Sequence, residues 1–471
     1  MTEQSRLTPA TFVLAVVTIA CGAANYAVPG LLPALSDHLH LTIPVIGQST
    51  TLFGIASGVA SPVIGVTTAH WPRRRVLSTG LALTMAGNLL AAAAPSFAAL
   101  LAARLITALG SASAMTAALG QAAEINTASR RARAMAVPIA GLTLALVAAP
   151  PTAGLFAQRH GPTVVFLALA TLSGAALLAA RITLPGESPP SPQSSLRERL
   201  RVATHPQVPA TLTAKFAAAT AAFAFHTYGP TQTAHPAMLF TAYGIGAVIG
   251  NQAGGRAADR YTPRLTATAA TTVQLVTFAA WPWLSSNTVA ATAAAFLAGA
   301  AFWSIQPALA RRLADLAPHQ PTPALALDTS VVYLGMGCGG AVGALTTVSA
   351  GQGGFSGALI VLSAVSLTCL VFSGRNVIRS RVSESFSPEK TDRTSPMGRP
   401  ALGRDASIEA LVTPELKTRF RHLCAVRKRS MSDMVNDLIE RELSGCEQQL
   451  ELEVTPATDH DEAPEDLRAA S

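Results

Sequence analysis

The chain has little charge and few aromatic side chains. Only 13% of its 471 residues are charged and only 5% are aromatic, whereas a soluble domain carries about 25% charged residues. Its five cysteines are scattered, and none is paired at the spacing of a metal site. We therefore expect free thiols rather than a zinc site, and the composition argues against a soluble globular fold.

Long apolar runs stand where charge is missing. Half of the residues are hydrophobic and the mean hydropathy is +0.38. Runs of about twenty residues can cross a hydrocarbon core of roughly 30 Å as helices. We predict an all-α membrane protein with twelve transmembrane helices at 10–35, 45–69, 76–94, 97–122, 134–157, 162–181, 208–229, 236–257, 264–284, 287–310, 325–349 and 355–373.

Arginine lies in every second connection between these runs. The basic connections are near 73–75, 130–133, 181–201, 256–264, 311–312 and 375–381, and in the others Arg159 is the single exception. Cationic loops remain in the cytoplasm. The pattern therefore predicts a multi-pass protein of the inner (cytoplasmic) membrane with both termini cytoplasmic, and it accounts for most of the net charge of +8.

The runs divide into two halves joined by a long loop. We predict an N-terminal six-helix half at 8–181, a cytoplasmic linker loop rich in Pro and Ser at 182–207, and a C-terminal six-helix half at 208–375. The sequence GVTTAHWPRRRVL after the second run resembles GRAADRYTPRL after the eighth. Two similar halves are typical of a duplicated transporter body.

These loops resemble the G-x-x-x-D-R-x-G-R-R signature of the major facilitator superfamily. The first copy keeps Gly65, Arg73 and Arg74 but has Ala69 in place of Asp, and the second keeps Gly255, Asp259, Arg260 and Arg264. The resemblance implies that the acid–base contact of this loop is made in one half only. A second resemblance, to the G-P-x-x-G-G motif of drug:proton antiporters in the family, lies in the fifth run and includes Pro150, Pro151 and Gly154.

Three ionisable residues are candidates for transport and proton coupling, because charge inside a bilayer is costly and often functional. Arg104 is in the middle of the fourth run, where the resemblance implies a role in proton coupling; a structural Arg is the alternative. Asp328 could bind and release a proton or cap a helix. Lys215 could contribute to coupling or extend toward the inner interface.

Polar and aromatic residues within the runs could line a substrate path or hold helices together. They are Asn25, Tyr26, Gln274, Trp303, Gln306 and Tyr333. The leading hypothesis is a secondary active transporter, not an enzyme, that exports a small amphiphilic drug or metabolite by alternating access. It needs no cofactor beyond a proton gradient. A sugar or nucleoside exporter is the alternative cargo class.

The C-terminal segment has a different composition. We predict a disordered linker at 376–406, a strand-helix-helix module at 407–445 and an acidic disordered tail at 446–471. The module resembles the ribbon-helix-helix DNA-binding fold, which implies self-association through the tail. DNA or phosphate contacts would fall to Arg427, Lys428, Arg429 and Ser432, although Glu409 on the strand disfavours nucleic acid. A membrane-tethered regulator is the alternative function.

Overall fold

The computed structural model describes residues 8–68, 70–126, 131–184, 207–317 and 321–372, all of which belong to one compact unit. Within these ranges every regular element is a helix. The predicted module at 407–445, its flanking segments at 376–406 and 446–471, and most of the loop at 182–207 lie outside the described residues. The contacts expected from Arg427, Lys428, Arg429 and Ser432 therefore stay predictions.

Six helices form the first half. They are α1 (Pro9–Leu39), α2 (Ile43–Thr67), α3 (Arg73–Ala92), α4 (Phe97–Glu124), α5 (Arg131–His160) and α6 (Pro162–Thr183). Their bounds follow local signals, such as the Ser96 hydroxyl, which accepts a hydrogen bond from Ala99 N at the start of α4. Prolines lie inside α1, α2 and α5, which a helix bundle tolerates because neighbours satisfy the freed backbone groups.

The second half contains α8 (Val208–Tyr228), the short 3-10 helix η3 (Pro230–Gln232), α9 (Pro236–Arg260), α10 (Pro263–Leu284), α11 (Thr288–Leu316) and α12 (Pro321–Phe372). The eleventh and twelfth predicted runs correspond to the two helical parts of α12. They are separated by Gly351, whose φ of 58° and ψ of −151° break the helical path. A glycine can adopt this left-handed region without the clash that a side chain would meet.

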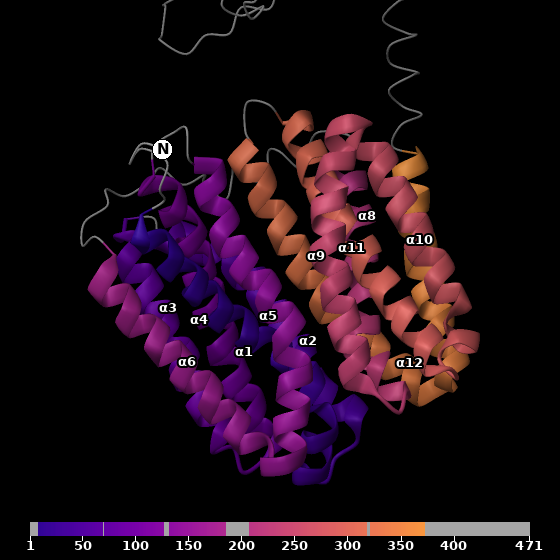
Figure 1. The fold of residues 1–471 in the computed structure, drawn as a ribbon, viewed down its shortest axis with the longest axis horizontal. Coiled ribbons are helices and arrows are strands. Elements are labelled where there is room, and N and C mark those ends of the chain that lie inside the picture. Colours follow the sequence, from indigo (N-terminus) through magenta and orange to yellow (C-terminus); the bar gives the residue numbers. More distant parts are fainter. Residues whose placement is uncertain (1–7, 69, 127–130, 185–206, 318–320, 373–471) are drawn as a thin grey trace, which may run out of the picture. The chain divides into compact units, whose positions relative to one another are not determined.

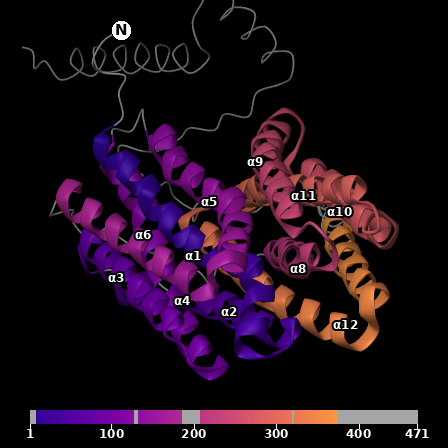
Figure 2. The same ribbon diagram turned by 60° about the horizontal axis from the view of Figure 1, so that its bottom comes forward.

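The two halves lie side by side (Figures 1 and 2). Helices α1–α6 pack on one another, α8–α12 do the same, and the halves meet mainly through α2 with α12 and α5 with α9. A core of apolar side chains continues across that junction, and it includes Tyr26 and Phe53 of the first half and Phe223, Tyr243 and Phe302 of the second. Of the predicted cavity residues, Tyr26 belongs to this core, and Trp303 and Tyr333 pack against it.

Nine segments of the described residues are long and apolar enough to cross a membrane. They are α1, α2, α4, α5, α6, α8, α11 and the two parts of α12. Helices α3, α9 and α10 were also predicted as spans and form at the predicted places, but Thr, Gly, Asn and Arg dilute their apolar side chains. The chain is a multi-pass helical protein, and the twelve-span count stays a prediction.

Candidate functional site

Lys215 and Asp328 form a buried ion pair inside the second half. Lys215 is in the second turn of α8, Asp328 is in α12, and Lys215 Nζ lies 2.5 Å from Asp328 Oδ1. The side chains are 1% and 11% exposed. Lys215 Nζ also approaches the backbone carbonyl of Gln306 in α11 at 3.5 Å. Two residues that the sequence offered as separate candidates thus form a single charge-neutral unit.

Arg104 is the corresponding buried charge of the first half. Its Nη1 donates to the Ala24 carbonyl of α1 at 2.7 Å, and its guanidinium carbon lies 4.3 Å from the centroid of the Phe53 ring of α2. Among the described residues no carboxylate lies within ion-pair distance of Arg104, and its Nε has no hydrogen-bond partner. The charge is therefore stabilised by a carbonyl dipole and an aromatic face, which is weaker compensation than a carboxylate gives.

The predicted cavity residues divide into fully and partly buried groups. Asn25 and Tyr26 of α1 are buried beside the carbonyl that holds Arg104, and Gln274 of α10 is buried with its Nε2 donating to Ala218 O at 3.1 Å. Gln274 therefore holds α10 and α8 together, which is the structural role predicted as the alternative to lining a substrate path. The half-buried members of the group, which lie on α11 and α12, are Trp303, Gln306 and Tyr333.

A histidine that the sequence did not place among the leading candidates connects the two halves. The His226 ring of α8 is 2% exposed, and its Nε2 has no hydrogen-bond partner among the described residues. Its ring centroid lies 6.3 Å from that of Tyr26 in the first half and 4.9 Å from that of Tyr243 in α9. The sequence next to His226 consists mainly of Ala, Phe and Thr and does not predict these aromatic neighbours. They come from α1, α8 and α9, which the fold brings together.

Both halves carry an ion pair at the ends where the signature loops lie. In the first, Arg73 Nε at the start of α3 lies 2.5 Å from Glu124 Oε1 at the end of α4. In the second, Asp259 of α9 pairs with Arg311 of α11. A contact with the motif's own carboxylate is therefore made in the second half, where Asp259 supplies it. Glu124 supplies the carboxylate that the first copy of the motif lacks.

Another pair of arginines occupies matching positions in the two loops. Arg74 donates to the Arg181 carbonyl at the end of α6 at 2.5 Å, and Arg264 donates to the Leu370 and Val371 carbonyls at the end of α12 at 2.9 and 2.6 Å. Cations at the C-terminus of a helix satisfy its last carbonyls and oppose its dipole. The remaining motif residues make fewer contacts: Gly65 lies near the end of α2, Gly255 has open space around it, and Arg260 lies over the Tyr261 ring.

Helices α1 and α5 approach closely at the proline motif. A Cβ at Gly154 would lie 3.0 Å from the Gly30 carbonyl oxygen, and a Cβ at Gly30 would collide with the Pro150 carbonyl. Pro150 and Pro151 lie within α5. This segment of α5 is therefore packed closely on α1.

The two ion pairs of the signature loops are expected to differ in strength. Glu124→Gln removes a carboxylate that is 26% exposed, whereas Asp259→Asn removes one that is 70% exposed. Exposed pairs contribute about 0–1 kcal/mol because water screens them. We expect Asp259→Asn to leave the thermal unfolding midpoint in detergent unchanged and Glu124→Gln to lower it measurably. A larger loss for Asp259→Asn would contradict this order.

Paired halves, a buried charge or ion pair within each half and matching loop contacts define a membrane transporter of duplicated architecture. A family model described as Major Facilitator Superfamily matches residues 14–236 and 234–427, and the chain belongs to this family.

Similar proteins agree with this assignment. The chain is 25% identical over 374 residues to the uncharacterized MFS-type transporter YbcL of Bacillus subtilis (strain 168), covering 77% of the chain and 96% of YbcL. It is 29% identical over 350 residues to the chloramphenicol resistance protein of Streptomyces lividans, covering 71% and 88%. The crystal structure of a point mutant of the nucleoside transporter NupG has the same fold, with a TM-score of 0.64, 12% identity and coverage of 78% and 99%.

Proposed function

We propose that the chain is a proton-coupled exporter of small, neutral, amphiphilic compounds, with twelve spans and both termini in the cytoplasm. The observation that carries the proposal is the Lys215–Asp328 pair, which is buried within the second half. An ion pair at this depth is a costly arrangement that apolar side chains could replace. A pair that must open and close during transport explains its presence better than stability does.

Coupling would depend on competition between a proton and the Lys215 ammonium for the Asp328 carboxylate. Protonation of the carboxylate removes the partner of Lys215, and among the described residues the ammonium then keeps the Gln306 carbonyl, 3.5 Å away, as its hydrogen-bond acceptor. Because α8 and α12 are the two helices that hold the pair, a change in its charge state alters the contact between them. Proton uptake from one side and release to the other would thus favour different arrangements of the second half.

Substrate would bind near the junction of the halves, where aromatic and amide groups come from both. Tyr26 and His226 face one another there, with Trp303, Gln306 and Tyr333 half-buried on α11 and α12. Pockets for small ligands are largely apolar with a few polar groups that orient the ligand. A neutral aromatic compound fits this composition, and the relative named for chloramphenicol resistance makes that antibiotic a reasonable first test compound.

Everted membrane vesicles test the proposal directly. Vesicles that contain the protein are expected to accumulate labelled chloramphenicol, or another compound from a panel of neutral aromatic amphiphiles, when respiration acidifies their interior. A protonophore should abolish the accumulation. Accumulation that persists after the gradient has collapsed would refute proton coupling. Export that survives deletion of 376–471 would favour a transporter over a tail-dependent regulator.

Arg104 gives a second test of the same proposal. Arg104→Lys keeps the positive charge but removes the planar group that lies over Phe53. Because guanidinium and ammonium differ in hydrogen-bond geometry and stacking, we expect export to fall about tenfold, the equivalent of about 1.4 kcal/mol. Arg104→Met should reduce it further. Initial rates of counterflow provide the measurement, and a wild-type rate in Arg104→Met would exclude Arg104 from the transport mechanism.

A further inference from the structure

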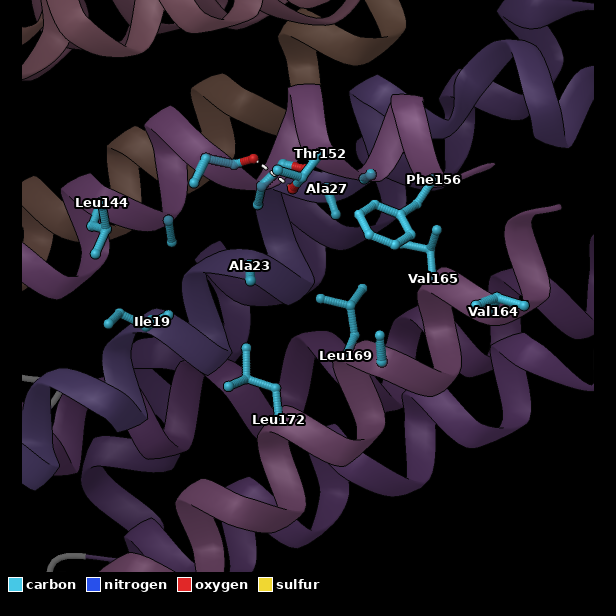
Figure 3. A pocket seen from close by; sticks show the side chains of 15 residues that line it. Ile19, Ala23, Ala27, Leu144, Thr152, Phe156, Val164, Val165, Leu169 and Leu172 are labelled. Atoms are coloured by element: carbon cyan, nitrogen blue, oxygen red, sulfur yellow. Dashed lines mark hydrogen bonds between the residues drawn. The ribbon is translucent and has the colours of Figure 1, made fainter. Parts of the chain in front are cut away.

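An apolar pocket opens on the side of the first half, away from the charged residues. It has a volume of about 450 Å³ and lies between α1, α5 and α6, as Figure 3 shows. None of its lining residues belongs to α8–α12. At its mouth the side chains of Leu144, Phe156 and Val164 are 55%, 57% and 42% exposed. In a membrane-spanning body, exposed apolar side chains at this depth face lipid.

The pocket exists because α6 does not close against α1 and α5. Helices α1 and α5 touch through small residues, and a Cβ at Gly22 would lie 2.8 Å from the Ala145 Cβ. Helix α6 has its larger contact with α3, where a Cβ at Gly174 would lie 3.1 Å from the Met85 Sδ. The facing surfaces are lined largely by alanine, so their side chains leave the space between the three helices unfilled.

The chemistry of the lining selects an apolar occupant. Thr152 is the one polar side chain among the lining residues, and its hydroxyl already donates to the Ala148 and Ala149 carbonyls at 2.6 and 3.2 Å. A transported amphiphile would need polar groups that fix its orientation, and the pocket offers none that is free. The section of α1 from Ile19 to Ala27 is ~12 Å long at ~1.5 Å per residue and runs along the pocket.

We propose that the pocket binds one acyl chain of a membrane phospholipid as a resident ligand. The Phe156 and Val164 end of the pocket lies next to the connection between α5 and α6, which the arginine pattern assigns to the outer side. The lipid therefore comes from the outer leaflet, with its chain parallel to the three helices. The acyl chain fills the space on one side of α5. The opposite face of α5 packs on α9, where a Cβ at Gly244 would lie 3.0 Å from the Val147 Cγ2.

Photolabelling tests this proposal without any assumption about export. The full-length protein is reconstituted in phosphatidylethanolamine and phosphatidylglycerol vesicles with a trace of phosphatidylcholine that carries a diazirine near the end of one acyl chain. After illumination, labelled peptides are identified by mass spectrometry. We expect label to concentrate on 144–156 and 164–172, well above the level around Val361, an exposed side chain of α12.

A matched pair of variants gives the control. Ala168 and Ala175 are both exposed residues on the same face of α6, but only Ala168 lines the pocket. Ala168→Phe displaces about two buried methylenes and should reduce labelling about tenfold, whereas Ala175→Phe should not change it. Ala168→Leu replaces the first variant if that one fails to fold.

Three outcomes would overturn the proposal. They are uniform labelling of all bilayer-facing segments, undiminished labelling in the folded Ala168 variant, and displacement of the label by added chloramphenicol. The last would assign the pocket to transported compounds instead.

Discussion

Lys215→Met is expected to reduce proton-driven export by at least about a hundredfold while Asp328 remains. The substitution leaves a carboxylate buried without its ammonium partner, and breaking such a pair costs about 3–5 kcal/mol. Without the ammonium the pair no longer exists, so the change in its charge state on which coupling depends is lost. Initial rates of respiration-driven uptake in everted vesicles provide the measurement, corrected for the amount of folded protein.

The double variant Lys215→Met with Asp328→Asn separates stability from coupling. It contains no unpaired charge, so expression and the thermal unfolding midpoint should recover relative to Lys215→Met. Proton-driven export should not recover, because no titratable group is left at the site. A double variant that regains both stability and gradient-dependent export would show that the pair only supports the fold.

Gly54→Leu is expected to reduce export strongly while leaving each half folded. A Cβ at Gly54 of α2 would lie 2.6 Å from the Gly337 Cα of α12. Alternating access requires contacts between the halves to form and break, and a leucine here prevents the close approach of α2 and α12. Each half should nevertheless fold, since each has an apolar cluster of its own. Export rate and elution volume on size exclusion report the two effects.

Gly357→Leu is the matched control for this prediction. Gly357 lies in the last part of α12 with no atom within 4 Å of a Cβ placed on it. The added side chain should therefore leave both export and assembly near the wild-type level. Equal losses for the two substitutions would mean that leucine acts through general destabilisation, and the role assigned to the contact between α2 and α12 would be wrong.

Helix positions follow closely from the sequence because hydrophobic length and helix-ending residues are local properties. The predicted run at 162–181 corresponds to α6 (Pro162–Thr183), and the run at 264–284 to α10 (Pro263–Leu284). The connection predicted between the eleventh and twelfth runs is also present, as the break in helical geometry at Gly351 within α12. Helices α3, α9 and α10 form where the sequence predicted spans. They are not among the nine segments that are apolar enough to cross a membrane.

The pairings within the site could not be predicted in the same way. Lys215 and Asp328 are 113 residues apart, and their contact depends on how α8 packs on α12. The acceptor for Arg104 is a backbone carbonyl, which every residue has, so the sequence contains no sign of it. Arg73 and Glu124 are 51 residues apart, and their pairing likewise depends on how α3 packs on α4. Single residues could thus be chosen from their charge and depth, but their partners depend on the tertiary packing.

Proton movement during downhill efflux of a compound tests the central role of the Lys215–Asp328 pair most directly. Proteoliposomes with a trapped pH indicator are loaded with an exported compound, and the pH change is recorded when the outside is diluted. The wild type should move protons opposite to the compound, and the double variant should exchange the compound without moving protons. Proton movement of wild-type size in the double variant would contradict the account.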